Sequence, residues 1–322
     1  MGQETMSKNG IKTAFVAGAG VGKRLRPLTA NRPKPLVPLY NRPLITYVFD
    51  ALLAVGIERI VVNTHHCPQS YEEILRLERG QGTYRGMQIE CIYEPVLLET
   101  GGGIKNAARL FGDEPVLVHN GDIFASVDLP GLLHAHTTTR PEVTAHLRSF
   151  GGPLQVSYQP VTQEITDFRG ALGLGSDAGF LFSGIYIIEP AFIRRIPPDT
   201  IISVVPVFLD MLRAGVTING FLDDSGVWAD LGNRDAYLDA HATVPRPAEE
   251  GRISVDPSAE VSASATLRGF VAIGARAVIE DGAVIQDSVI WEGAKIASDA
   301  QLVRCIVRDH QFAQGILVDQ DI

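Results

Sequence analysis

The chain has 322 residues, of which 45% are hydrophobic and 20% are charged, and this balance excludes an intrinsically disordered protein. Its formal net charge of −9 argues against nucleic acid or an anionic membrane surface as the main partner. No apolar run reaches the length of a membrane span and the polar start MGQETMSKNG lacks a signal-peptide core, so we expect a cytoplasmic protein.

The cysteines and histidines do not predict a structural site. Cys67, Cys91 and Cys305 are odd in number, far apart and not in a CxxC arrangement, which suits a reducing compartment and excludes a disulfide framework. His65, His66 and Cys67 are consecutive, and neighbouring strand residues point to opposite faces, so a shared zinc ion is disfavoured.

The first 120 residues alternate short apolar runs with helical patterns. Strand patterns occur in TAFVAG, IERIVVNTH, MQIECIYE and EPVLVHNGD, and helical patterns in LITYVFDALLAVG, SYEEILRLE and GGIKNAARLF. This alternation predicts an α/β fold with a Rossmann-like mixed, mostly parallel sheet. Ligands of such sheets bind beyond the carboxyl ends of the strands, so the residues that follow each strand are the candidate site.

Further strand and helix patterns up to residue 242 complete the same domain, which we place at residues 13–242. Residues 1–12 are expected to be disordered. The segment TVPRPAEEG breaks the pattern with two prolines and acidic residues, which predicts a linker at residues 243–252.

The last segment, residues 253–322, carries a six-residue repeat. Val255, Val261 and Leu267 are six residues apart, and after an irregular step the same spacing resumes at Val278, Val284, Ile290, Ile296 and Leu302. Aliphatic residues at this period, with small residues between them, predict a short left-handed parallel β-helix. A helix of so few coils needs a neighbour to cover its open end. We therefore expect a docking module and a homo-oligomer. A hexapeptide acyltransferase is the alternative, but His310 is the only histidine of this segment.

A glycine-rich loop follows the first strand pattern, and its backbone amides, free of side-chain bulk, suit a phosphate or a base. The loop residues are Ala17, Gly18, Ala19, Gly20, Val21 and Gly22. The loop is not a P-loop, because Lys23 is followed by Arg24 and not by Ser or Thr. It is not a dinucleotide fingerprint either, because Lys23 occupies the position of the third glycine.

Positive charge is concentrated around this loop. From Thr5 to Phe49 the chain has no acidic residue. Its basic residues there are Lys8, Lys12, Lys23, Arg24, Arg26, Arg32, Lys34 and Arg42. Lys34 lies between Pro33 and Pro35, which favour extended backbone before them and predict a stiff, straight segment. These features together predict a phosphate site on an acidic protein, in preference to a solvated loop.

Two aspartates follow apolar strand patterns, Asp122 in VLVHNGD and Asp230 in GVWADLG. Carboxylates from two strand ends can hold a Mg²⁺ ion that keeps its waters and binds substrate phosphate oxygens. A surface turn is the alternative for each of the two residues.

These motifs resemble the sugar-1-phosphate nucleotidylyltransferases over residues 13–242. AGAGVGKRLRPLT and PKPL are similar to the family's signature, NGD to its metal-binding motif, and SGIY and WADLGN to later landmarks. LLETGGGI is similar to the loop of bacterial mannose 1-phosphate guanylyltransferases and N-acetylmuramic acid 1-phosphate uridylyltransferases. The resemblance implies a GT-A-like domain that transfers a nucleotidyl group from a nucleoside triphosphate to a sugar 1-phosphate and releases pyrophosphate.

The resemblance also implies roles for single residues. It places the glycine loop on the nucleotide, Arg24 and Lys34 on the phosphates, and Asp122 and Asp230 on Mg²⁺. Contacts to the base and the sugar are implied for Gly101, Gly102, Gly103, Asn120, Gly121, Ser183 and Gly184.

The chain departs from the family pattern at two places. Lys23 replaces the usual Thr or Glu and is expected either to touch the leaving pyrophosphate or to face solvent. The Glu-Lys-Pro motif that binds the sugar phosphate in many relatives is absent, so Arg169 and Glu164 are candidate sugar contacts. A catalytically silent nucleotide-sugar sensor and a binding scaffold are the alternative functions, although neither needs all four of Arg24, Lys34, Asp122 and Asp230.

Overall fold

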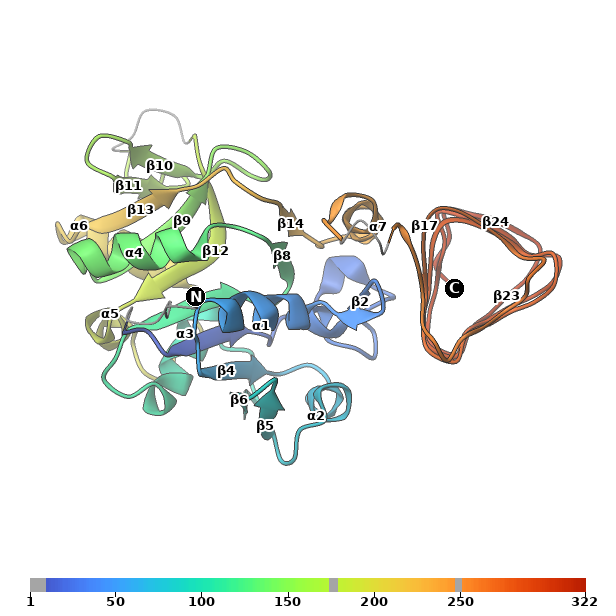
Figure 1. Ribbon diagram of the computed structural model, residues 1–322. Coiled ribbons are helices and arrows are strands. Elements are labelled where there is room, and N and C mark those ends of the chain that lie inside the picture. Colours follow the sequence, from blue (N-terminus) through green and yellow to red (C-terminus); the bar gives the residue numbers. More distant parts are fainter. Residues whose placement is uncertain (1–9, 174–178, 247–250) are drawn as a thin grey trace, which may run out of the picture. The chain divides into compact units, whose positions relative to one another are not determined.

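The computed structural model describes residues 10–173, 179–246 and 251–322 and divides into two compact units (Figure 1). The first unit is the chain up to Val21 together with Ile45–Asp230, and the second is Gly22–Leu44 together with Leu231–Ile322. The chain therefore changes unit within the glycine loop, and the second unit carries Lys23, Arg24 and Lys34. The predicted N-terminal segment and linker lie partly outside the described residues.

The first unit is built on a ten-stranded mixed sheet in the order β10-β11-β13-β9-β12-β7-β1-β4-β6-β5. These strands are β1 (Thr13–Ala17), β4 (Arg59–Thr64), β5 (Gln81–Tyr84), β6 (Met87–Tyr93), β7 (Val116–Asn120), β9 (Val143–Arg148), β10 (Val156–Gln159), β11 (Glu164–Phe168), β12 (Leu181–Ile188) and β13 (Ile218–Leu222). The central strands β7, β1, β4 and β6 are parallel, and β12 is antiparallel to both β7 and β9. The predicted mixed α/β class is confirmed.

Helices accompany this sheet, and the first three of them lie at the predicted places. They are α1 (Ile45–Ala54), α2 (Gln69–Leu75), α3 (Glu99–Ala107), α4 (Leu129–Thr139), α5 (Pro190–Arg195) and α6 (Val204–Arg213), with a 3-10 turn η3 (Ala108–Leu110). In α6 the apolar residues Val204, Val207, Phe208 and Met211 recur at helical spacing and are buried in the sheet's core. None of the helices in the described ranges is long and apolar enough to cross a lipid bilayer.

The second unit contains a C-terminal stack of parallel strands, residues 253–322, called the strand stack below. Its strands are β15 (Ile253–Val255), β16 (Glu260–Val261), β17 (Thr266–Ile273), β18 (Val278–Ile279), β19 (Val284–Ile290), β20 (Lys295–Ile296), β21 (Gln301–Val303), β22 (Ile306–Val307), β23 (Phe312–Ala313) and β24 (Ile316–Val318). They form two parallel sheets, β15-β17-β19-β21-β24 with β22 beside β19, and β16-β18-β20-β23. Seen end-on, successive turns of the chain superimpose as a triangle (Figure 1).

The strand register shifts the phase of the predicted repeat. One row contains Val261, Ile279, Ile296 and Ala313, and a second contains Leu267, Ile285, Leu302 and Leu317. Ile279 and Ile285 are buried, whereas Val278 and Val284 are half-buried neighbours. For Val278 and Val284 the prediction was wrong by one residue. The six-residue period continues to Ile285, and the step from Ile285 to Ile290 is the first shorter one.

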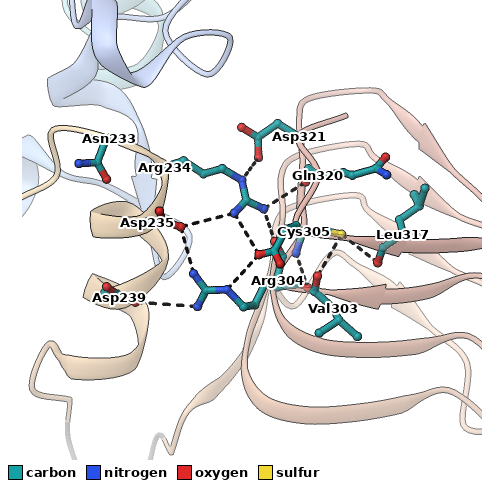
Figure 2. A network of polar contacts seen from close by, with 12 residues as sticks. Asn233, Arg234, Asp235, Asp239, Val303, Arg304, Cys305, Leu317, Gln320 and Asp321 are labelled. Carbon is teal, nitrogen blue, oxygen red and sulfur yellow. Dashed lines mark hydrogen bonds and ion pairs between the residues drawn. The ribbon is translucent and has the colours of Figure 1, made fainter.

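The same unit holds the short elements of the Gly22–Leu44 segment and one helix. They are the 3-10 turns η1 (Lys23–Leu25) and η2 (Lys34–Leu36), the strands β2 (Pro38–Leu39) and β3 (Arg42–Pro43), and α7 (Arg234–Thr243). Two arginines join α7 to the strand stack (Figure 2): Arg234 donates from Nε to Asp321 Oδ1 at 2.7 Å, and Arg304 donates to Asp235 Oδ1 at 3.1 Å. The start of α7, four residues after Asp230, is therefore fixed on the strand stack.

Candidate active site

Buried side chains fix the first peptide of the glycine loop. Gly18 N donates to Asn63 Oδ1 at 2.8 Å, and Tyr71 donates its hydroxyl to Gly18 O at 2.8 Å. Asn63 donates in turn to Glu94 Oε1 at 2.8 Å, and Leu98 N donates to Glu94 Oε2 at 3.1 Å. The turn after β1 is thus held in one orientation by residues that follow or end β4 and β6.

Sequence reasoning missed these supporting residues. Burial raises the pKa of Glu94, while the hydrogen bonds from Asn63 and Leu98 N act in the opposite direction. Asn63 and Glu94 lie at strand ends, the places singled out from the sequence, but their use in supporting the loop had no signal in the sequence.

The three glycines of LLETGGGI lie buried in α3. A Cβ on Gly103 would come within 2.7 Å of Asn63 Nδ2 and 2.9 Å of Glu94 Oε1, so only glycine lets the helix pass this close. Gly102 N donates to Ile202 O at 3.0 Å, and Gly101 lies against the same segment. Close packing explains why these three positions are glycine. Their contacts to the base and the sugar stay a prediction.

The ends of β1 and β7 lie side by side. Ala17 pairs with Asn120, and Gly121 N donates to Ala17 O at 2.9 Å. A Cβ on Gly184 of β12 would come within 2.4 Å of Asn120 Nδ2, so that side chain passes directly over the glycine. Four of the predicted site residues, from three separate stretches of the sequence, therefore meet at one edge of the sheet.

The two predicted metal ligands lie at the same end of a small ribbon. β8 (Ile123–Ala125) pairs antiparallel with β14 (Trp228–Asp230), and Asp230 stands opposite Ile123, the residue after Asp122. Both aspartates are half-buried. No group of three or more His, Cys, Asp or Glu with metal-binding geometry occurs among the described residues. Mg²⁺ is commonly held by one or two carboxylates plus waters and substrate phosphates, and this pair of carboxylates fits that donor set.

A buried guanidinium holds the turn that leads into β14. Arg148, 1% exposed, donates to the carbonyl oxygens of Ser225 at 2.7 Å and of Asp224 and Gly226 at 3.3 Å each. Trp228 Nε1 donates to Ser183 O at 2.9 Å. Arg148 therefore fixes the segment that ends at Asp230, a role that the sequence analysis did not predict.

Ser183 belongs to a buried polar network beside this turn. It is 1% exposed, and its Oγ lies 3.0 Å from His146 Nδ1. His146 Nε2 lies 3.3 Å from Asp223 Oδ2. Burial opposes ionisation of Asp223, yet hydrogen bonds from Ser225, Asp128 N and His146 together lower its pKa to about 2. The structure thus gives Ser183 contacts within the protein, and its predicted substrate contact is untested.

The basic residues of the second unit differ in exposure. Lys23 and Arg24 are exposed in η1, whereas Lys34 is 4% exposed. Gly22 adopts φ 61°, the left-handed region that favours glycine, and its carbonyl oxygen accepts a hydrogen bond from Thr29 Oγ1 at 2.8 Å.

The backbone at Lys34 corrects one expectation. Pro33 is extended, but Lys34 begins the 3-10 turn η2 and not a straight segment. Hydrogen bonds from Leu36 N to Pro33 O at 2.9 Å and from Val37 N to Lys34 O at 3.1 Å close this turn, and Leu36 is buried. The stiffness predicted from the two prolines is therefore supplied by a closed, buried turn.

The two candidate sugar contacts lie elsewhere in the sheet. Successive strand pairs link Glu164 to Leu117 of β7 by way of Asn219, Thr144 and Ile187. Glu164 is therefore level with a residue that lies three positions before Asn120. Three strands separate β11 from β7. Arg169 follows the other end of β11, farther still from Asn120, and is exposed with its Nε 3.1 Å from Gln155 Oε1. This register removes the support for Arg169 as a substitute for the missing lysine.

Comparisons with known proteins agree with this geometry. Residues 13–150 match the family described as "Nucleotidyl transferase", and residues 249–314 match the "GMPPB C-terminal domain". A mannose-1-phosphate guanylyltransferase of Mycobacterium tuberculosis is 32% identical over 90% of this chain and 83% of its own length. The catalytic subunit beta of mannose-1-phosphate guanylyltransferase from Danio rerio is 28% identical over 91% of this chain and 85% of its own.

A second group of relatives matches a smaller share of the chain. An N-acetylmuramate alpha-1-phosphate uridylyltransferase of Neisseria meningitidis is 30% identical over 71% of this chain and 96% of its own length. By their names, both groups act on a sugar 1-phosphate. The chain therefore belongs to the sugar-1-phosphate nucleotidylyltransferase family.

Proposed function

We propose that the chain transfers the guanylyl group of GTP to mannose 1-phosphate and releases pyrophosphate. The extent of the similarity supports this choice of substrates. The guanylyltransferase relatives match 89–92% of the chain, and the "GMPPB C-terminal domain" match covers most of the strand stack. The uridylyltransferase relatives match only 71–72% of it.

The observation that carries the proposal is the ribbon register that sets Asp230 beside Asp122. In the proposed reaction these two carboxylates hold Mg²⁺, which would neutralise charge on the phosphates. Arg24 and Lys34 bind phosphate oxygens, and the amides of the glycine loop bind the nucleotide.

The chemistry is a displacement at phosphorus. An oxygen of the sugar phosphate attacks the α-phosphorus of GTP, the bond from that phosphorus to the β-phosphate oxygen breaks, and pyrophosphate leaves with the electron pair. Because no side chain of the protein is the nucleophile, catalysis comes from positioning and charge stabilisation. Asn63 and Arg148 serve it indirectly, since they hold Gly18 and the segment before Asp230.

We also propose that the first unit is GT-A-like and that the strand stack is a left-handed parallel β-helix through which copies of the chain associate. Parallel pairing throughout the strand stack and its end-on triangular outline support the β-helix. For association, the last strands leave apolar side chains in solvent, with Phe312 52%, Ile316 73% and Val318 51% exposed. Sedimentation should show a dimer or larger species that Ile316→Lys dissociates; a monomeric wild type at micromolar concentration would refute association.

The substrates are tested with a panel of nucleoside triphosphates and sugar 1-phosphates, read out as pyrophosphate release. The highest kcat/KM is expected for GTP with mannose 1-phosphate. A higher value for UTP with N-acetylmuramic acid 1-phosphate would reassign the substrates, and absence of turnover with every pair would favour the silent sensor.

A further inference from the structure

A single arginine attaches the Lys34 segment to the strand stack. Arg32 donates from Nη2 to Asp309 Oδ2 at 2.8 Å, and its Cζ lies 5.1 Å from the centroid of the Trp291 ring. The guanidinium thus has a carboxylate and an aromatic face as partners, which are the two groups that arginine recognises best. We call Arg32, Trp291 and Asp309 the Arg32 cluster.

Both partners of Arg32 are themselves fixed. Trp291 is 3% exposed, and its Nε1 lies 3.1 Å from the hydroxyl of Tyr237 on α7. Tyr237 in turn donates to Pro38 O, in the same segment as Lys34. Asp309 Oδ1 is buried and has no hydrogen-bond partner among the described residues, so the ion pair of Asp309 Oδ2 with Arg32 offsets the burial of this carboxylate. The Arg32 cluster is therefore an ordered attachment point.

Further contacts attach the segment on the other side of Lys34. Tyr40 N donates to His241 Nε2 at 3.2 Å, and Asn41 Nδ2 donates to Ile273 O of β17 at 2.8 Å. Lys34 thus lies between two attachments, two residues after Arg32 and six before Tyr40. A short, closed turn held at both ends has little freedom to move, so its lysine is ordered before any ligand binds.

We propose that Arg32 is a positioning residue for Lys34, and that the strand stack orders the phosphate-binding segment through the Arg32 cluster. The inference rests on the proposed function for the role of Lys34. It gives the C-terminal repeat a part in catalysis by its own chain, in addition to any part in association.

A direct phosphate contact by Arg32 is the competing explanation, and the two explanations give opposite signs for one substitution. If Arg32 bound phosphate itself, Asp309→Asn would release it from a competing carboxylate and lower the KM for GTP. If Arg32 positions Lys34, Asp309→Asn loosens the segment and raises that KM. Misplacement of a catalytic group by about 1 Å can cost up to roughly 100-fold in rate.

The kinetic test compares Asp309→Asn, Arg32→Ala, Arg32→Lys and the double variant Arg32→Ala/Asp309→Asn. We expect kcat/KM for GTP to fall about tenfold in Asp309→Asn and about 10- to 100-fold in Arg32→Ala, with partial recovery in Arg32→Lys. The double variant should have a kcat/KM no lower than that of Arg32→Ala, because both changes remove the same contact. Arg276→Gln, which breaks the ion pair with Glu292 elsewhere on the strand stack, is the matched control and should keep the wild-type value.

A second measurement separates this inference from the proposed function. Hydrogen exchange of the unliganded protein reports on the amides of Leu36 and Val37, which close the turn at Lys34. Their exchange should accelerate in Asp309→Asn and not in Arg276→Gln. Unchanged exchange in Asp309→Asn, or a lowered KM for GTP, would overturn the inference. A wild type without guanylyltransferase activity would overturn the proposed function, and the exchange result would still decide the role of the Arg32 cluster.

Discussion

Asp230 stands across the β8–β14 ribbon from Ile123, directly beside the position of Asp122. The two aspartates are more than a hundred residues apart in the chain, and this register is what brings them together. A slip in the pairing of the two strands would move Asp230 away from the end of β8 that Asp122 precedes. The ribbon therefore needs support, and Arg148 and the Trp228–Ser183 contact provide it.

Arg148→Met should destabilise the first unit and lower activity together. The change leaves the carbonyl oxygens of residues 224–226 without their buried donor, and leaving a buried acceptor unsatisfied typically costs about 1–3 kcal/mol. Denaturant unfolding measures the loss of stability. The turnover rate, normalised to the concentration of folded protein, measures the effect of displacing Asp230. Arg213→Met, at an exposed ion pair with Asp210, is the control and should change stability by less than about 1 kcal/mol. Wild-type stability in Arg148→Met would show that the turn does not depend on the guanidinium.

Asn63→Ala should weaken nucleotide binding more than it lowers stability. It removes the acceptor of Gly18 N and the donor to Glu94, so the first amide of the glycine loop loses its orientation. We expect the KM for GTP to rise at least about tenfold, with a stability loss of roughly 1–3 kcal/mol from the unpaired groups. Steady-state kinetics and thermal unfolding check the two effects. Asn219→Ala, whose amide contacts Thr139 on the surface, should leave the KM unchanged. The same KM for GTP in both variants would show that Asn63 has no role in nucleotide binding.

The sequence predicted those features that depend on local pattern. Apolar periodicity located β1, β4, β7 and α1, and its position after a strand singled out Asp122. It could not predict the partner of Asp122, because antiparallel pairing of β8 with β14 depends on contacts between distant segments. It could not predict the role of Arg148 or Asn63 either, since a buried side chain that bonds backbone groups of another segment leaves no local signal.

The errors have similar causes. Val278 and Val284 fit a six-residue period as well as Ile279 and Ile285 do, and only stacking on neighbouring coils decides between them. Strand order and direction put Arg169 far along the sheet from Asn120, and its contact with the sugar stays a prediction.

Acid should destabilise the folded chain below about pH 6.5. Burial lowers the pKa of His119 and of His241 to about 4 in the folded state, whereas the unfolded chain takes up these protons near the ordinary value of 6.5. Stability from these groups is thus fully present above pH 6.5 and is lost as the pH falls toward 4, by up to about 1.4 kcal/mol per pH unit for each group. His136 and His146, whose pKa values are also lowered by burial, act in the same direction, and the raised pKa of Glu94 opposes them.

Denaturant unfolding at pH 7.0, 5.5 and 4.5 checks this prediction. His241→Gln should be less stable than wild type at pH 7.0, because Tyr40 N loses its acceptor, but its stability should fall less steeply with acid. The exposed control His310→Gln should keep the wild-type slope. A steeper or unchanged slope in His241→Gln would contradict a neutral, buried imidazole.

The central claim is that Asp122 and Asp230 act together on one Mg²⁺ ion during guanylyl transfer. The most direct test measures kcat with saturating GTP, mannose 1-phosphate and Mg²⁺ for Asp122→Asn, Asp230→Asn and the double variant, with the 95% exposed Asp113→Asn as control. Each single change should lower kcat by roughly 100-fold or more, and the double variant should be little slower than the slower single variant, because both remove ligands of the same ion. A wild-type kcat in either single variant, with folding intact, would contradict the account.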